Sequence, residues 1–482
     1  MPGTERVTTE AGGGSTAARA LLTPLLLLVA YGLLNVACIL HPVFAPRARA
    51  AELLLFAALT LTLAGALNLG RHPRAPAPVA RWDSPLLVLV CTLLTSLGLQ
   101  IHYGVNIGNR TAPVLLMARM GFVAVGLLAL PYLAMLVPAR SAWRRLAWPC
   151  GPALILFALG IGVVLKVAGI VYEPRAAIDT WEVMQSGCQY LFQGLNPYAT
   201  DMPGSVSLGR AFGNPAATYA YPPAMLLLTA PAFGLGGDTR FAFVAADLAA
   251  ALLMLLIGRL AGGGPRMARY SELAALLVMF HPTSFAKAWN DPLIVPVMFG
   301  FSLLALRRAG GCAEAALGGF LLSMKQYLIF LAWLLLVRLR RPTRILVAVA
   351  TALVLVVPFV IWNPGALYRS MIEFHLRTPF RADGLTIAAY LAREHGLRPP
   401  PWLGTAAAAV MVVAASLLAR RQGYLGTVVW AAATYLTLFA GSSYAFPNYY
   451  QFVMGVMLLG GVLALSALPR EAPAGPDRAE PT

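Results

Sequence analysis

The residues best suited to acid–base chemistry lie in one polar stretch, 173–223, of an otherwise apolar chain. Hydrophobic residues make up 59% of the sequence, which has only 19 acidic residues. Asp179 and Glu182 both fall in this stretch. A single carboxylate can take the proton from an attacking hydroxyl, whereas a second, protonated carboxyl group is needed only when the leaving group must be protonated. We therefore predict that one carboxylate of this stretch is the general base of a group transfer.

Two other interpretations of these carboxylates stay open. The spacing of Asp179 and Glu182 resembles a capping box, in which Asp179 caps a helix that begins near Trp181. The same two side chains could bind a metal ion, but they are too few to complete a calcium or magnesium site. We therefore expect neither a metal nor a cofactor.

The lysines are a second signal. Only three of the 36 basic residues are lysines, and all lie in or beside apolar segments. A lysine in the middle of a bilayer costs roughly 2.5 to 3.5 kcal/mol on insertion scales, which makes it a candidate for function. Lys325 is too central to snorkel easily, so we expect it to pair with a phosphate or carboxylate. Snorkelling to the interface is the alternative for Lys166 and Lys287.

More cations follow in the polar segment 363–402. Arg377 and Arg381 alternate there with apolar residues, a pattern suited to an interfacial helix beside lipid headgroups. His375 could bind a phosphate or carry a proton. A phosphate leaving group departs as an anion, so the site requires cations rather than a second acid. A plain amphipathic surface helix is the other explanation.

The remaining candidates are amide, acidic and aromatic residues that could bind a polar ligand, and the family resemblance described below implies which of them would hold a sugar, an acceptor or the donor. For the sugar and acceptor they are Trp181, Glu182, Asn196, Tyr198, Tyr221, Asn290, Asp291, Asn448 and Tyr449. Gln326 joins Lys325, Lys287, His375, Arg377 and Arg381 as a candidate for the donor phosphate. Aromatic belts at the membrane interface explain such tyrosines and tryptophans equally well.

The elements that must position these residues are membrane helices. Only 11% of residues are charged, and apolar runs of near 20 residues recur along the chain, which excludes an ordinary soluble domain. We predict an all-α, polytopic transmembrane bundle of about 12 to 14 segments with amphipathic loop helices. Fourteen apolar segments can be counted: 20–40, 51–70, 84–102, 112–137, 149–171, 222–236, 241–262, 272–289, 292–306, 313–337, 344–362, 403–419, 425–441 and 449–467.

Charge distribution predicts the orientation. The formal net charge is +17, but the arginines cluster in short turns between apolar segments, as the positive-inside rule describes, and not along a nucleic-acid-binding face. This pattern predicts cytoplasmic N- and C-termini and outer loops at 173–221 and 363–402. The tails, 1–19 and 468–482, have a composition typical of disorder.

Two topologies fit the middle of the chain. If all fourteen segments cross, several arginines between 259 and 308 lie outside, against the charge rule. If 222–236 only dips into the membrane and 313–337 is a re-entrant hairpin, those arginines return to the cytoplasm. We favour the second topology.

A series of short motifs resembles glycosyltransferase family 87. In order, the motifs are Asp179 and Trp181, Gly194-x-Asn196-Pro197-Tyr198, Tyr221-Pro222-Pro223, Asn290-Asp291-Pro292, Lys325-Gln326-Tyr327, Pro379-Phe380-Arg381-x-Asp383 and Asn448-Tyr449-Tyr450. The family contains polyprenyl-phosphate-mannose-dependent mannosyltransferases of the membrane C-type superfamily. The chain departs from it at Gly441-Ser442-Ser443-Tyr444, where a lysine is expected.

The resemblance implies a division of the chain and an activity. It covers a glycosyltransferase-like membrane domain at 149–467, preceded by a four-span extension at 20–148. It implies an inverting transfer of a hexose, mannose being the expected one, from a polyprenyl-phosphate sugar to a glycolipid or polysaccharide acceptor. Asp179 would be the base, at the outer face of a bacterial cytoplasmic membrane. The partners would be these substrates and membrane lipids. A secondary transporter or lipid flippase that uses Lys325 and intramembrane aspartates is the alternative, although no internal repeat supports it.

Overall fold

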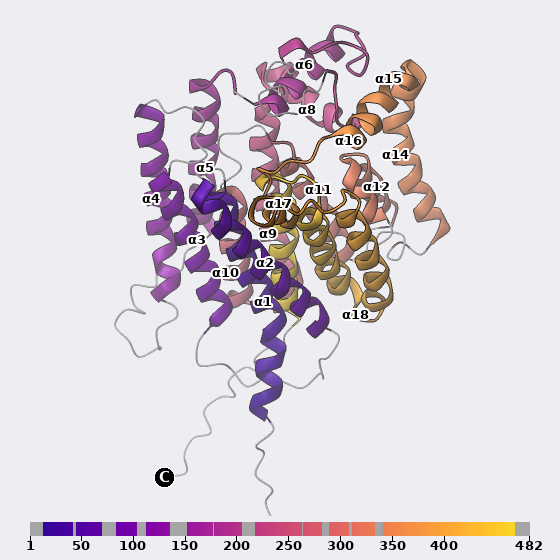
Figure 1. Cartoon of the computed structure of the whole chain (residues 1–482). Coiled ribbons are helices and arrows are strands. Elements are labelled where there is room, and N and C mark those ends of the chain that lie inside the picture. Colours follow the sequence, from indigo (N-terminus) through magenta and orange to yellow (C-terminus); the bar gives the residue numbers. More distant parts are fainter. Residues whose placement is uncertain are drawn as a thin grey trace, which may run out of the picture.

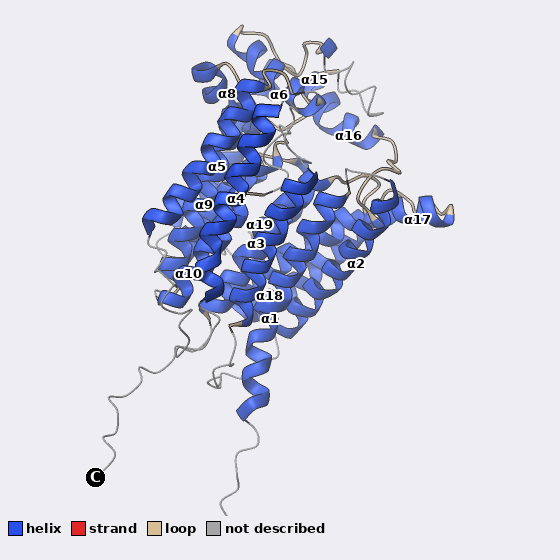
Figure 2. Ribbon diagram, turned by 90° about the vertical axis from the view of Figure 1, so that its left-hand side faces the viewer, coloured by secondary structure: helices blue, strands red, loops and turns tan. Residues whose placement is uncertain are grey.

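The computed structural model describes residues 13–41, 45–69, 83–103, 112–134, 152–176, 178–204, 217–262, 264–281, 289–307, 311–332, 339 and 341–467. Within these ranges the chain forms helices and loops and no strand (Figure 2). This confirms the predicted all-α class. Lys287 and the arginine-rich turns near 71–81 and 140–145 lie outside the described residues.

Eight helices in the described ranges are long and apolar enough to cross a membrane. They are α1 (Gly13–Leu40), α2 (Ala45–Asn68), α3 (Ser84–Tyr103), α5 (Pro152–Tyr172), α9 (Arg240–Ala261), α14 (Pro342–Trp362), the second half of α18 (Leu403–Gly441) and α19 (Pro447–Ser466). Shorter apolar stretches lie in α4 (Ala112–Ala134), α8 (Pro223–Gly236), α11 (Ile294–Leu306), α12 (Gly311–Leu322) and the first half of α18. The more polar helix α10 (Pro265–Met279) packs against α9 and α3. The molecule therefore has the architecture of a multi-pass membrane protein.

Helix α19 lies at the centre of the bundle. Nearly all of its residues are buried, and it packs against α1, α18, α10 and α11. Glycines allow the close approach: an added Cβ would meet Val295 at Gly455 and Leu28 at Gly461. Because α1 packs directly on α19, the N-terminal helices share one hydrophobic core with the rest of the chain.

Helix α8 begins and ends at the same end of the bundle. Pro222 and Pro223 start it, as the sequence predicts for proline at a first helical turn. At its far end, the carbonyl of Gly237 accepts a hydrogen bond of 2.6 Å from Gln185 of α6 (Asp179–Phe192), and Figure 1 shows α6 and α8 together at the upper end of the molecule. That 222–236 dips into the membrane without crossing it stays a prediction.

Two hairpins follow. Helix α12 ends at Leu322, the chain is extended at Lys325 in front of the 3₁₀ turn η4 (Gln326–Leu328), and it returns so that Leu339 packs against Ala315 near the start of α12. Helix α18 is two antiparallel helices that turn at Gly423, where φ is 67°, so that the backbones of Gly404 and Gly441 touch. That 313–337 is re-entrant stays a prediction, because residues 333–338 lie outside the described part of the chain.

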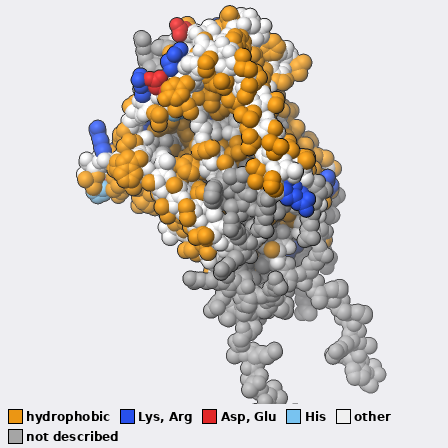
Figure 3. Space-filling view, turned by 90° about the vertical axis from the view of Figure 1, so that its right-hand side faces the viewer, with side chains coloured by type: hydrophobic (Ala, Val, Ile, Leu, Met, Phe, Trp, Pro, Cys, Tyr) orange, Lys and Arg blue, Asp and Glu red, His pale blue; other side chains and the backbone are white. Residues whose placement is uncertain are grey.

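The second polar segment forms short helices above the bundle. These are α15 (Pro364–Tyr368), the π-helical turn η5 (Arg369–Glu373), α16 (Phe374–Arg377) and α17 (Ile387–His395). Asn363 caps α15 and Thr386 caps α17, each by accepting a backbone N–H. On the described part of the face in Figure 3, apolar side chains predominate and charged ones appear at only a few places.

Candidate functional site

Asp179 is the first residue of α6 and is half-buried. It is not the cap of this helix: the cap position is Ile178, which makes no side-chain bond, so the capping box is wrong. One carboxylate oxygen of Asp179 accepts the backbone N–H of Thr180 at 2.8 Å. Burial raises the pKa of this carboxyl, against smaller lowering effects of Thr180 and of the positive charge of Arg381. Asp179 therefore has the properties of a weakly solvated base.

Glu182, one turn along α6, has a different environment. Its carboxylate lies at 3.5 Å from the hydroxyl of Ser186 on the same helix. An added Cβ at Gly204 would lie 2.4 Å from this carboxylate, so the loop backbone packs over it. Glu182 thus supports the local fold of the loop, and it serves as a natural comparison for Asp179.

A buried ion pair lies beneath the polar loops. Lys325 contacts Asp291 of the 3₁₀ turn η3 (Asp291–Leu293) at 2.7 Å, and the two side chains are 5% and 0% exposed. The hydroxyl of Tyr327 donates to the same Asp291 oxygen at 2.6 Å, and the amide of Asn448 donates to the other at 2.7 Å. The predicted carboxylate partner of Lys325 is therefore Asp291, and both oxygens of that carboxylate have a hydrogen-bond donor.

Three tyrosine rings surround the Lys325 ammonium group. Its Nζ lies 5.7 Å from the ring centroid of Tyr221, 5.3 Å from that of Tyr327 and 5.0 Å from that of Tyr449. These distances are within the range of cation–π attraction. The rings come from the first polar loop, the α12 hairpin and α19, so the lysine draws three distant segments together.

His375 joins the two polar loops. Its Nε2 donates to the carbonyl of Ala220 at 2.9 Å, and Nδ1 accepts from the hydroxyl of Tyr444 at 3.3 Å. Burial lowers the pKa of His375 by more than its hydrogen bond to the Ala220 carbonyl raises it, and the charge of Lys325 lowers it further, so the imidazole is neutral near pH 7. Gln326 donates to the same Ala220 carbonyl at 3.1 Å and to that of Met371 at 3.3 Å. Residues 220 and 221 are therefore the junction of the site.

The two arginines of the second loop have different positions. Arg381 is only 15% exposed, pairs with Asp383 at 2.6 Å and lies 4.9 Å from the ring centroid of Phe446. It is near enough to Asp179 for each charge to influence the other. Arg377 is 78% exposed and pairs with Glu373 at 2.5 Å. The charge of Arg381 thus acts on Asp179, whereas Arg377 lies at the surface.

The other sugar-site candidates mostly hold the loops in place. Trp181 is buried, with its indole N–H 3.3 Å from Asp238 and Arg240 against its ring. Asn196 accepts the backbone N–H of Tyr198 at 2.9 Å, and the Tyr198 hydroxyl donates to the carbonyl of Tyr221 at 2.8 Å. These contacts stiffen the segments that carry Asp179 and Tyr221.

Asn290 is an exception. It is 1% exposed, and neither its amide nitrogen nor its amide oxygen has a partner among the described residues. A buried amide without hydrogen bonds is unfavourable, so Asn290 has unused capacity for a polar ligand or a water molecule next to Asp291.

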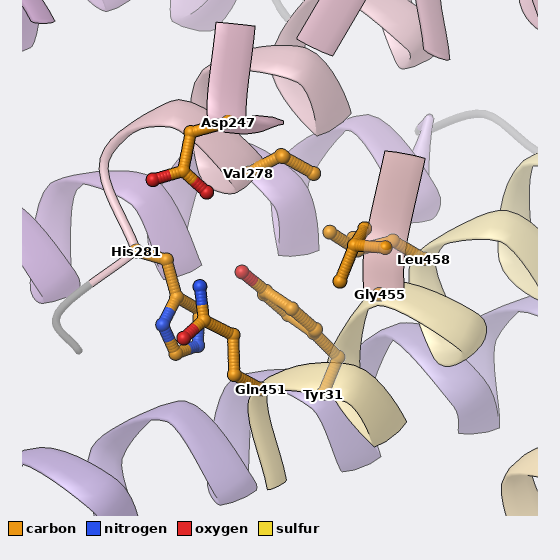
Figure 4. Close-up of a pocket in the computed structure, with 8 residues that line it drawn as sticks. Tyr31, Asp247, Val278, His281, Gln451, Gly455 and Leu458 are labelled. Carbon is orange, nitrogen blue, oxygen red and sulfur yellow. The ribbon is translucent and has the colours of Figure 1, made fainter. Parts of the chain in front are cut away.

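Sequence reasoning missed a second buried pair, deeper in the bundle. Lys166 of α5 contacts Asp247 of α9 at 2.5 Å, and the two side chains are 2% and 3% exposed, so Lys166 does not snorkel. Asp247, His281, Gln451 and Tyr31 line a cavity of about 10 Å³, room for about one water molecule (Figure 4). The only sequence signal for this pair was one lysine and one aspartate in apolar segments.

Sequence reasoning also gave no role to Tyr444 and to the Asp238–Arg240 pair. Asp238 and Arg240 are buried and make a forked contact, with the shortest distance 2.6 Å.

In the part of the chain that the structure describes, His, Cys, Asp and Glu side chains form no group of three that would hold a metal ion. In comparisons with known proteins, no family model, curated protein or solved structure matches the chain.

Proposed function

We propose that the protein is an integral-membrane inverting glycosyltransferase that moves a hexose from a polyprenyl-phosphate sugar to a lipid or envelope glycan acceptor. The observation that carries the proposal is the environment of Asp179: it is a half-buried carboxylate with a raised pKa, and the charge of Arg381 acts on it. Tyr221, whose pKa Asp179 influences, lies against the buried Lys325–Asp291 pair. The order of motifs similar to glycosyltransferase family 87 supports the same activity. Mannose is the sugar that this similarity suggests.

In this mechanism Asp179 accepts the proton of the acceptor hydroxyl as the oxygen attacks the anomeric carbon. The bond from that carbon to the phosphate oxygen breaks at the opposite face, and the lipid phosphate leaves as an anion. A base whose pKa is raised toward the working pH is the more effective proton acceptor. The hydroxyl proton thus ends on Asp179 and the bonding electrons on the phosphate.

Arg381 is the best candidate to meet the phosphate. Among the described residues it is the cation whose charge acts on Asp179, and its guanidinium pairs with Asp383, which is 63% exposed, so this pair borders on solvent where a phosphate can approach. Lys325 is already neutralised by Asp291 and contributes mainly through the tyrosines that it holds. His375, being neutral and bonded on both ring nitrogens, orients the loops rather than carrying charge.

Sugar transfer by purified protein with defined lipid-linked donors is the direct test. Asp179→Asn is expected to lower kcat by about 10² to 10⁴-fold, while donor binding persists. Glu182→Gln is the matched control, one turn away on the same helix, and should retain most activity. Equal activity of Asp179→Asn and the unaltered protein would show that Asp179 is not the base.

A transporter or flippase is the second candidate, favoured by the buried Lys166–Asp247 pair beside a cavity in the bundle. The same preparation in vesicles separates the two. A protein that moves a lipid-linked sugar across the bilayer without transferring it, and that is insensitive to Asp179→Asn, would favour this second function.

A further inference from the structure

The N-terminal helices contact the polar loop that carries Arg381. Helix α2 lies against α17: the ring of Phe56 meets that of Tyr390 edge-on, with centroids 5.8 Å apart. Two ion pairs join the same helices, Arg49 with Glu394 and Glu52 with Arg393. The extension at 20–148, for which the sequence suggests no role, therefore reaches the candidate site.

The two ion pairs differ in burial. The side chain of Arg49 is 63% exposed, whereas that of Glu52 is 1% exposed. An exposed pair contributes little because water and salt screen it, but a buried carboxylate requires its partner. Glu52 is therefore the side chain of α2 on which this contact depends.

Arg393 connects Glu52 to the loop. One terminal nitrogen of its guanidinium donates to the carboxylate of Glu52, and the other donates to the carbonyl of Ala382. Ala382 lies between Arg381 and Asp383, so this bond acts on the backbone between the two members of that ion pair.

Other contacts fix both sides of this position. The backbone N–H of Arg381 donates to the carbonyl of Ser443 at 3.1 Å, and the backbone N–H of Leu385 donates to the carbonyl of Ala445 at 2.7 Å. The hydroxyl of Tyr450 donates to the carbonyl of Leu385 at 2.6 Å. The loop is thus held on one side by the segment before α19 and on the other by Arg393.

We propose that helix α2 positions the donor-phosphate arginine: Glu52 fixes Arg393, and Arg393 holds the Ala382 carbonyl, so that the neighbouring Arg381 keeps its place in the loop. Glu52 and Arg393 are positioning residues, since neither touches the reacting atoms. The inference rests on the proposed function for its catalytic consequence, but the clamp itself is a property of the fold.

The first test measures the loop without any substrate. In detergent-solubilised protein whose five cysteines have been replaced, an Ala382→Cys probe is labelled with a maleimide. Adding Glu52→Gln is expected to speed labelling about tenfold, since it weakens a charge-assisted hydrogen bond that restrains this position. Arg49→Gln, which removes the exposed pair of the same helix, should leave the rate unchanged. Equal rates with Glu52→Gln and Arg49→Gln would overturn the clamp.

The second test measures catalysis on the natural cysteine background. Glu52→Gln is expected to raise the KM for the lipid-linked donor about tenfold, with the KM for the acceptor unchanged, because only the phosphate contact is displaced. Faster labelling with an unchanged donor KM would overturn the positioning role. Absence of any transfer by the unaltered protein would refute the proposed function instead, and the labelling rates would still decide whether the clamp exists.

Discussion

Asp179 and Lys325 both belong to the candidate site, but the partners that compensate their charges differ. Lys325 has a buried counter-ion, Asp291, and its Nζ lies 5.0 to 5.7 Å from the centroids of three tyrosine rings. Asp179 has hydrogen bonds only from its neighbour Thr180 among the bonds described, and no ion pair. A fully paired charge supports structure, whereas a carboxylate without an ion pair is available for chemistry.

The raised pKa of Asp179 predicts an effect on stability. Since its pKa is higher in the folded protein than in the unfolded chain, ionising it disfavours the fold. Its contribution to stability is present at acid pH and is lost as the pH rises through the raised value. Asp179→Asn should therefore unfold at a slightly higher temperature than the unaltered protein at pH 7, with the difference vanishing near pH 4. A lower unfolding temperature at pH 7 would mean that the carboxylate is structural.

The Lys325–Asp291 pair predicts non-additive substitutions. Lys325→Met leaves Asp291 buried without its counter-ion, which should destabilise the protein by about 3 to 5 kcal/mol. Lys325→Met combined with Asp291→Asn should recover most of that loss. Thermal unfolding in detergent measures both variants. If the double variant still binds the donor, Lys325 supports the fold. If it does not bind the donor, Lys325 contacts the donor phosphate.

At the scale of elements, the sequence predicted where helices and loops lie along the chain better than which of the helices cross the membrane. The apolar runs gave the helices, and Pro222-Pro223 gave the start of α8. The turn inside α18 was predicted as a break between 403–419 and 425–441, and Gly423 with its positive φ explains it. What hydropathy did not decide is whether a short apolar run crosses, because a dipping helix and a crossing helix have the same composition.

Labelling from one side of the membrane tests these paths. Probes at Leu235→Cys, at the end of α8, and Ala199→Cys, in the first polar loop, should react with an impermeant maleimide from the same side. A probe at Arg307→Cys, after α11, should react only once the membrane is opened. Reaction of the Leu235 and Ala199 probes from opposite sides would show that α8 crosses.

At the scale of the whole molecule, the pairings between helices could not be predicted. A lysine in an apolar segment shows that some partner exists, but Lys166 and Asp247 are 81 positions apart and Lys325 and Asp291 are 34 apart. Spacing along a single helix encodes neighbours three or four residues away, not contacts between helices. For the same reason, the approach of α2 to Arg393 depends on the packing of α1 against α19, which no local pattern reveals.

The Lys166–Asp247 pair allows this packing to be measured. It joins α5 to α9 beside α1 and α19, so Asp247→Ala, which leaves a buried ammonium without its partner, should lower stability by about 3 to 5 kcal/mol. Asp247→Leu together with Lys166→Met should restore most of it. The control is Arg266→Gln, whose pair with Asp83 is partly exposed and should matter little. If the single Asp247 variant unfolds at the temperature of the unaltered protein, this pair does not hold the bundle together, and its burial beside the cavity has to be explained by transport instead.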